Sequence, residues 1–173
     1  MFQIDDTVVY GSQGVCRVSQ ITEQKLAGKT MKYYILTPLN NSTLTIYVPV
    51  ENETLTSKMR RVLSPEEIKD IIHTMPAQEL IWVENDSERR DAYRDILSRG
   101  DTLELVQLAK TLFLRKQELV SMGKKLHSAD ETFLKDAETM LYDEFALVLN
   151  ITREEVVPFI TEEIQVSEKK KRG

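Results

Sequence analysis

Short runs of β-branched and aromatic residues alternate with turn-forming residues over the first fifty positions of the chain. These runs occupy residues 7–10, 15–21, 33–36 and 43–48. Valine, isoleucine, threonine and tyrosine favour strands, and the glycine-, asparagine- and proline-containing segments between the runs favour tight turns. Four or five short strands with tight connections predict a small antiparallel β barrel. Its predicted core contains Val8, Val15, Val18, Ile35, Leu44 and Ile46.

The hydrophobic spacing changes to that of helices after residue 63. Ser64, Pro65 and Glu67 have the order expected at a helix N-terminus, with a capping serine, a proline at the first helical position and an acid at the third. We predict helices at residues 64–74, 82–98, 101–123 and 128–150, the last two opened by Asp101 and Ser128. A final short helix should follow Thr152, and Pro158 should kink or shorten it because proline lacks a backbone donor.

The change of period near residue 60 marks a domain boundary. We therefore predict an α+β fold in two domains, with the β barrel in residues 1–60 and an all-α helical bundle in residues 61–165. Residues 166–173 are rich in lysine and poor in apolar residues, so we expect a basic disordered tail.

Composition narrows the class of protein. No run of eighteen apolar residues is present for a membrane span, and the first residues lack the basic and apolar segments of a signal peptide, so we expect a cytoplasmic protein without membrane association. Cys16 is the single cysteine, which excludes an internal disulfide and a cysteine-based metal cage. Its apolar neighbours predict a buried position.

The net charge of −5 argues against nonspecific coating of nucleic acid, because such binding needs clustered cations. Cations are nevertheless unevenly distributed. They gather at Arg89, Arg90, Arg94 and Arg99, at residues 115–116 and 124–125, and at residues 169–172. Acids lie among the first group, as expected of a solvated helix face, so a local basic surface and a plain exposed face both remain open.

The chain lacks the residue patterns of an enzyme. His73 and His127 stand in separate predicted helices, with no HExxH or repeated ligand spacing, so neither indicates a metal site. The glycine-rich phosphate loops and the GxSxG elbow are also missing. We expect no catalytic activity, no cofactor and no metal.

Tyrosines are concentrated in the predicted barrel. Tyr33 and Tyr34 must point to opposite faces of a regular strand, so one of them should pack inside, with Tyr10, and the other should be exposed together with Tyr47. Exposed aromatic side chains on a small barrel can also hold a peptide or a methylated lysine, and this binding function remains open.

The segments DTVVYGSQGVCRV at residues 6–18 and LTIYVPVEN at residues 44–52 resemble the RNA polymerase interaction domain shared by CarD/CdnL regulators and the transcription-repair coupling factor. Residues 98–101 and 130–149 are similar to the CarD C-terminal domain, and the helicase domains of the coupling factor are absent. The resemblance covers the chain to about residue 149. It implies a Tudor-like barrel that binds the polymerase β subunit, and helices that contact promoter DNA at the upstream edge of the transcription bubble and modulate open-complex stability.

The resemblance places the polymerase-binding strand at Thr45, Ile46, Tyr47 and Pro49. Strand addition suits such a contact, because a sheet edge offers unpaired amides and carbonyls. Many family members carry a basic residue where this chain has Tyr47.

The predicted DNA-binding residues are Trp82, Arg89, Arg90, Arg94 and Arg99. Better-known members insert a tryptophan wedge into the minor groove, and Asp86 stands at that position here. In a continuous helix Trp82 would lie one turn away on the same face, where it serves either as the wedge or as a core residue. The alternative function is a polymerase-binding adaptor, whose helices bind another protein or a second copy; the oligomeric state is left open.

Overall fold

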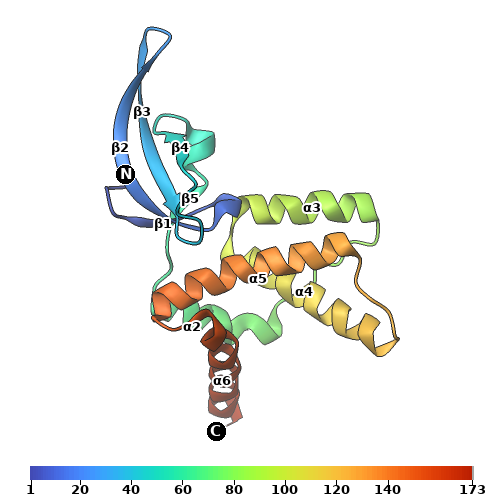
Figure 1. The fold of residues 1–173 in the computed structure, drawn as a ribbon. Helices are drawn as coiled ribbons and strands as arrows, with labels where there is room; N and C mark the ends of the chain where they lie inside the picture. Colours follow the sequence, from blue (N-terminus) through green and yellow to red (C-terminus); the bar gives the residue numbers. More distant parts are fainter. Residues whose placement is uncertain (173) are drawn as a thin grey trace. The chain divides into compact units, whose positions relative to one another are not determined.

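The computed structural model describes residues 1–172. The chain divides into two compact units, Met1–Val62 and Leu63–Gly173 (Figure 1). The first unit contains the sheet and the second the main helices, so the mixed α+β class is confirmed.

The first unit is a five-stranded antiparallel sheet with the strand order β4-β3-β2-β1-β5. Its strands are β1 (Thr7–Tyr10), β2 (Val15–Leu26), β3 (Lys29–Pro38), β4 (Ile46–Pro49) and β5 (Met59–Arg61); the short helices η1 (Gly11–Gln13) and α1 (Glu53–Thr56) lie between them. Over the part of the chain that the structure describes, the pairings leave β4 and β5 as edges. The predicted closure into a barrel is therefore wrong, because the two short outer strands do not pair with each other.

The core of this unit follows the predicted alternation for most positions. Its buried residues are Val8, Cys16, Val18, Tyr34, Leu36, Val48 and Met59, with Ile46 and Tyr10 packed against them. Tyr34 is the inward tyrosine and Tyr47 is exposed, as predicted. Leu44 is 38% exposed, so its predicted core position is wrong: it lies in the connection before β4 and not in a strand.

Strands β2 and β3 form a hairpin that is longer than the sequence predicted. They pair from Cys16 and Pro38 to Leu26 and Lys29. Ala27 and Gly28 make the turn, both with positive φ, as the type I′ hairpin turn requires. We did not predict residues 22–26 and 29–32 as strands, because their polar side chains lack a buried face.

The second unit contains α2 (Pro65–Thr74), η2 (Met75–Ala77), α3 (Asp86–Arg99), α4 (Thr102–Ser121), α5 (Ser128–Leu149) and α6 (Arg153–Arg172). Its core gathers apolar residues from every one of these α-helices; the largest fully buried side chains include Tyr93, Phe145, Ile68 and Leu108. The Ser64 capping box and the Asp101 cap are present, as predicted.

Three predicted helix boundaries are wrong. Helix α3 begins at Asp86 and not at Trp82, because Asn85 accepts a bond from the amide of Glu88 and so caps the helix there. His127, not Ser128, is the N-cap of α5. Helix α6 passes through Pro158 and continues to Arg172, where we expected a short helix and a disordered tail; Gly173 lies outside the described residues.

Apolar contacts explain the length of α6. Val156 is buried, and Phe159, Ile160 and Ile164 pack against the core of the unit on the far side of the proline. This packing on both sides compensates for the single backbone bond that Pro158 cannot form.

Candidate functional site

The predicted polymerase-binding residues lie on an edge of the sheet. Ile46, Tyr47 and Pro49 belong to β4, an edge strand of the sheet, and Thr45 immediately precedes it. Tyr47 is 50% exposed and Thr45 is exposed, whereas Ile46 packs partly against the core. The structure thus brings these four residues together on one open edge.

Backbone alternation identifies the groups that this edge offers. The amide of Val50 donates to the carbonyl of Lys32 at 2.9 Å, so Val50 faces β3. Because amides in an antiparallel strand point alternately to either side, Val48 and Ile46 also face β3, and Tyr47 faces outward. Pro49 occupies the next outward position. An amide there would point away from β3, so the missing N–H of proline removes no hydrogen bond from the sheet. Within β4, the outward amide is that of Tyr47.

The second candidate region is the connection before α3, which contains Trp82. Side chains of α3 and α4 hold its backbone on both sides of the tryptophan. The hydroxyl of Thr111 accepts from the amide of Ile81 at 3.0 Å, and the hydroxyl of Tyr93 donates to the carbonyl of Ile81 at 3.0 Å. Lys110 donates to the carbonyls of Pro76 and Gln78. The connection is therefore a fixed part of the unit.

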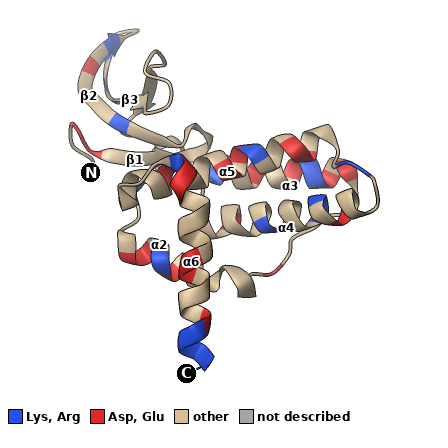
Figure 2. Ribbon diagram, turned by 60° about the horizontal axis from the view of Figure 1, so that its bottom comes forward, with Lys and Arg blue, Asp and Glu red and all other residues tan. Residues whose placement is uncertain are grey.

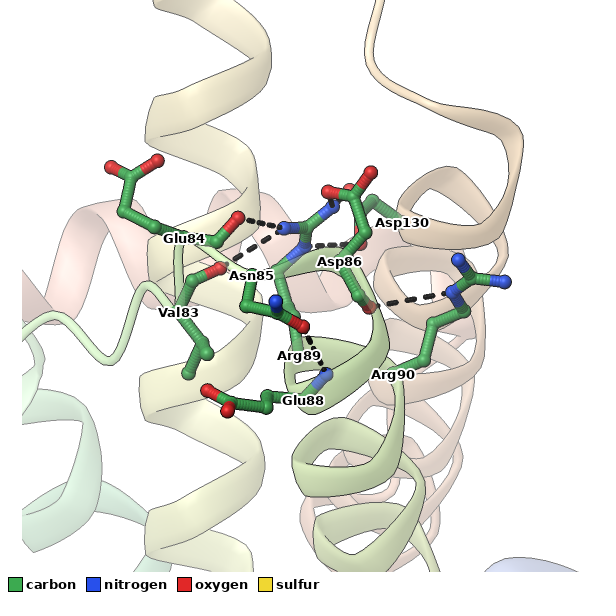
Figure 3. Close-up of polar contacts among 8 residues, drawn as sticks. All are labelled: Val83, Glu84, Asn85, Asp86, Glu88, Arg89, Arg90 and Asp130. Carbon is green, nitrogen blue, oxygen red and sulfur yellow. Dashed lines mark hydrogen bonds and ion pairs between the residues drawn. The ribbon is translucent and has the colours of Figure 1, made fainter.

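Arg89 completes this support from within the fold (Figure 3). Its guanidinium donates to the carbonyls of Val83 and Glu84 at 3.0 and 3.3 Å, and to both carboxylate oxygens of Asp130 at 3.0 and 2.9 Å. Asp86 accepts a further bond at 2.8 Å. Arg89 is 3% exposed and Asp130 is fully buried, so this is an internal ion pair. The prediction that Arg89 lies on a DNA-facing surface is wrong.

The electrostatics follow from the same contacts. The hydrogen bond from Arg89, reinforced by its charge, lowers the pKa of Asp86. Hydrogen bonding to Asp130 raises the pKa of Arg89 in turn. Burial raises the pKa of Tyr93 to about 12, so its hydroxyl remains a donor to the loop over the physiological range.

Trp82 lies against two guanidinium groups. The Cζ atoms of Arg89 and Arg115 lie 4.4 and 4.9 Å from the centre of its ring. The indole Nε1 is buried, and the ring packs partly against the core of the helical unit. Trp82 also borders a cleft of about 480 Å³, whose other lining residues include Lys124, Lys125 and His127. These three residues come from the connection between α4 and α5, and the sequence had not assigned them to the site.

The remaining predicted arginines do not form one surface. Arg90 and Arg94 are exposed and stand four positions apart on α3, where Arg94 lies 3.4 Å from Asp91. Arg99 makes two bonds with Glu104, at 2.9 and 2.6 Å. Figure 2 shows acidic and basic residues mixed along α3. Arg90, Arg94 and Arg99 are all exposed and stay predicted DNA contacts, and the Trp82 cleft is a separate feature.

Over residues 1–172, no cluster of histidine, cysteine and carboxylate side chains could hold a metal ion. No helix in that range is long and apolar enough to cross a membrane.

Comparison with known proteins matches each of the two units to a family domain. Residues 2–63 match the family model described as the CarD-like/TRCF RID domain, and residues 70–161 match the model described as CarD, C-terminal domain. A Bacillus subtilis (strain 168) protein named "Putative transcription factor YdeB" is 25% identical over 163 residues, which cover 92% of this chain and 99% of that protein.

Proposed function

The chain belongs to the CarD family of transcription regulators, and from this membership we propose that it binds the β subunit of RNA polymerase through β4 and promoter DNA through its helical unit. In this function it modulates the stability of the open complex at the upstream edge of the bubble. It acts by binding alone, without catalysis or a cofactor, in the cytoplasm with the polymerase.

The polymerase contact is supported by one observation above all, the open edge of β4 within a matched polymerase interaction domain. A partner strand placed there meets the outward amide and carbonyl of Tyr47. The side chains of Thr45 and Tyr47 are exposed beside that edge and can add specificity.

The DNA contact is supported by the exposed Arg90 and Arg94, and by Lys124 and Lys125, which line the Trp82 cleft together with Glu84 and Asp86. Phosphate contacts of this kind position a protein on the duplex without reading its sequence. Because the net charge is −5, we expect weak binding by the protein alone, with polymerase supplying the local concentration.

A second candidate function is favoured by the acids at the start of α3. Glu84, Asp86, Glu88 and Asp91 are exposed around the same end of the helix as Arg90. These charges repel phosphates and suit a basic protein surface instead. The adaptor function, in which the helices bind a protein, follows from that observation.

Footprinting of polymerase at a promoter, with and without the protein, separates the two functions. DNA binding predicts altered cleavage at the upstream edge of the bubble and a changed open-complex lifetime. An adaptor binds polymerase but leaves that edge of the footprint unchanged. If the protein does not bind polymerase at all, both functions are wrong.

A further inference from the structure

A stripe of apolar and aromatic side chains crosses β2, β3 and β4 on the face of the sheet opposite its core. We define the outer stripe as Leu26, Met31, Tyr33 and Tyr47. Leu26 is 57% exposed, Met31 is 38% exposed and Tyr47 is 50% exposed, and Tyr33 is half-buried. Large apolar side chains gathered on one exposed face indicate an interaction surface, whereas scattered ones need no explanation.

The strand register places all four residues on one face. Tyr34 and Val48 are paired core residues, so their neighbours Tyr33 and Tyr47 point to the opposite face. Met31 lies two positions from Tyr33 on the same strand. Lys29 lies two positions further, and its cross-strand partner is Leu26.

Contacts join most of the stripe into one surface. The rings of Tyr33 and Tyr47 pack edge to face with centroids 6.1 Å apart. The hydroxyl of Tyr33 donates to the sulfur of Met31 at 3.7 Å. The stripe therefore runs from the β4 edge along the hairpin toward its tip at Leu26.

The opposite face of the same hairpin segment is polar. It carries Glu23 opposite Lys32 and Lys25 opposite Thr30, all of them exposed. Beyond Thr22 and Tyr33 the hairpin has only two strands, which are marginally stable without a covering partner. The stripe face of this segment also carries Gln24 and Lys29, but its large side chains Leu26, Met31 and Tyr33 are apolar or aromatic, whereas the other face carries none, which indicates a contact through the stripe.

We propose that the outer stripe determines the specificity of the polymerase contact by packing against apolar side chains of the polymerase surface beside the β4 edge. The proposal rests on the proposed polymerase-binding function. The polymerase is the expected partner of the stripe because Tyr47 belongs both to the stripe and to the β4 edge that would accept the partner strand. Where many family members carry a basic residue, Tyr47 presents a ring, so the contact is apolar and responds weakly to salt.

The test uses the full chain and RNA polymerase, with affinity measured by calorimetry at low and high salt. Leu26→Ser with Met31→Ser should weaken binding about tenfold or more, because two apolar side chains no longer become buried. Lys25→Ser with Thr30→Ser is the matched control on the other face of the same hairpin, and its affinity should equal that of the wild type. The wild-type affinity should change little between the two salt concentrations.

Tyr47→Arg provides a second, independent variant at an exposed position. It should bind more weakly than the wild type and should gain a salt dependence. Circular dichroism and thermal melting establish that each variant is folded. If wild type binds and the Leu26/Met31 variant binds equally well, or if wild-type binding falls steeply with salt, the stripe proposal is overturned while the polymerase function stands. If the wild type itself does not bind, the proposed function fails and the stripe proposal with it.

Discussion

The buried guanidinium of Arg89 joins the Trp82 connection and the start of α3 to the start of α5, where Asp130 lies 41 positions further along the chain. Arg89→Ala leaves the carboxylate of Asp130 buried without its partner. Removing one member of such a pair typically costs about 3–5 kcal/mol, so the free energy of unfolding should fall by about that amount. Urea denaturation followed by Trp82 fluorescence measures the change.

Arg90→Ala is the matched control, because the neighbouring arginine is exposed and its Nε donates to the carbonyl of Asp86 at 3.3 Å. Its effect on stability should stay within about 0.5 kcal/mol. Equal losses from the two variants would contradict the structural role assigned to Arg89.

A second prediction at this scale concerns Glu138, whose pKa is raised mainly by desolvation on burial. A raised folded-state pKa means that ionisation costs stability, and the cost is complete above that pKa. Below the unfolded pKa both states are protonated, and the cost disappears. Glu138→Gln should therefore raise the melting temperature at neutral pH and have little effect near pH ~3, well below the ordinary glutamate pKa. A melting temperature that rises equally at both values would refute the electrostatic cause.

At the scale of the elements, the alternation along β4 gives two proline substitutions different consequences. Tyr47→Pro removes an outward amide, so the sheet should remain folded and polymerase affinity should fall by about three- to tenfold, the value of one hydrogen bond. Ile46→Pro removes an amide that faces β3 and should destabilise the sheet itself. Thermal melting and polymerase binding, measured on both variants, distinguish these effects; a stable Ile46→Pro protein would show that the alternation is assigned wrongly.

Local signals explain which elements the sequence could predict. Ser64 with Glu67 is a self-contained capping box, so the start of α2 was predictable. The start of α3 was missed because the apolar run of Leu80, Ile81 and Trp82 directly precedes the helix, although the backbone of this run is held by side chains of α3 and α4. Bonds between residues separated by 12 to 30 positions have no local signature.

The candidate site was predictable to a similar extent. Family resemblance located the edge strand, and the structure places Ile46 to Pro49 in it, with Thr45 immediately before it. Spacing alone could not separate Arg89 from Arg90, because their difference depends on Asp130, 41 residues further along the chain. The Trp82 cleft was missed for the same reason: its cations on the α4–α5 connection approach the tryptophan only after folding.

For the whole molecule, two hydrophobic cores account for the division into two units. The core of the sheet contains residues from Val8 to Met59, and the core of the helical unit contains residues from Ile68 to Val156, with no residue in common. The two proposed contacts, with polymerase and with DNA, are therefore carried by separately stabilised parts of one chain.

The last prediction follows from this separation. Arg89→Ala should lower the unfolding free energy of the helical unit and leave that of the sheet unchanged, because the ion pair lies wholly in residues 83–130. Hydrogen exchange should then show faster amide exchange in α3 and α5, with wild-type rates in β2 and β3. At a urea concentration that unfolds only the helical unit, the variant should still bind polymerase but no longer alter the upstream footprint. Loss of polymerase binding together with the helices would show that the sheet depends on the helical unit for its stability.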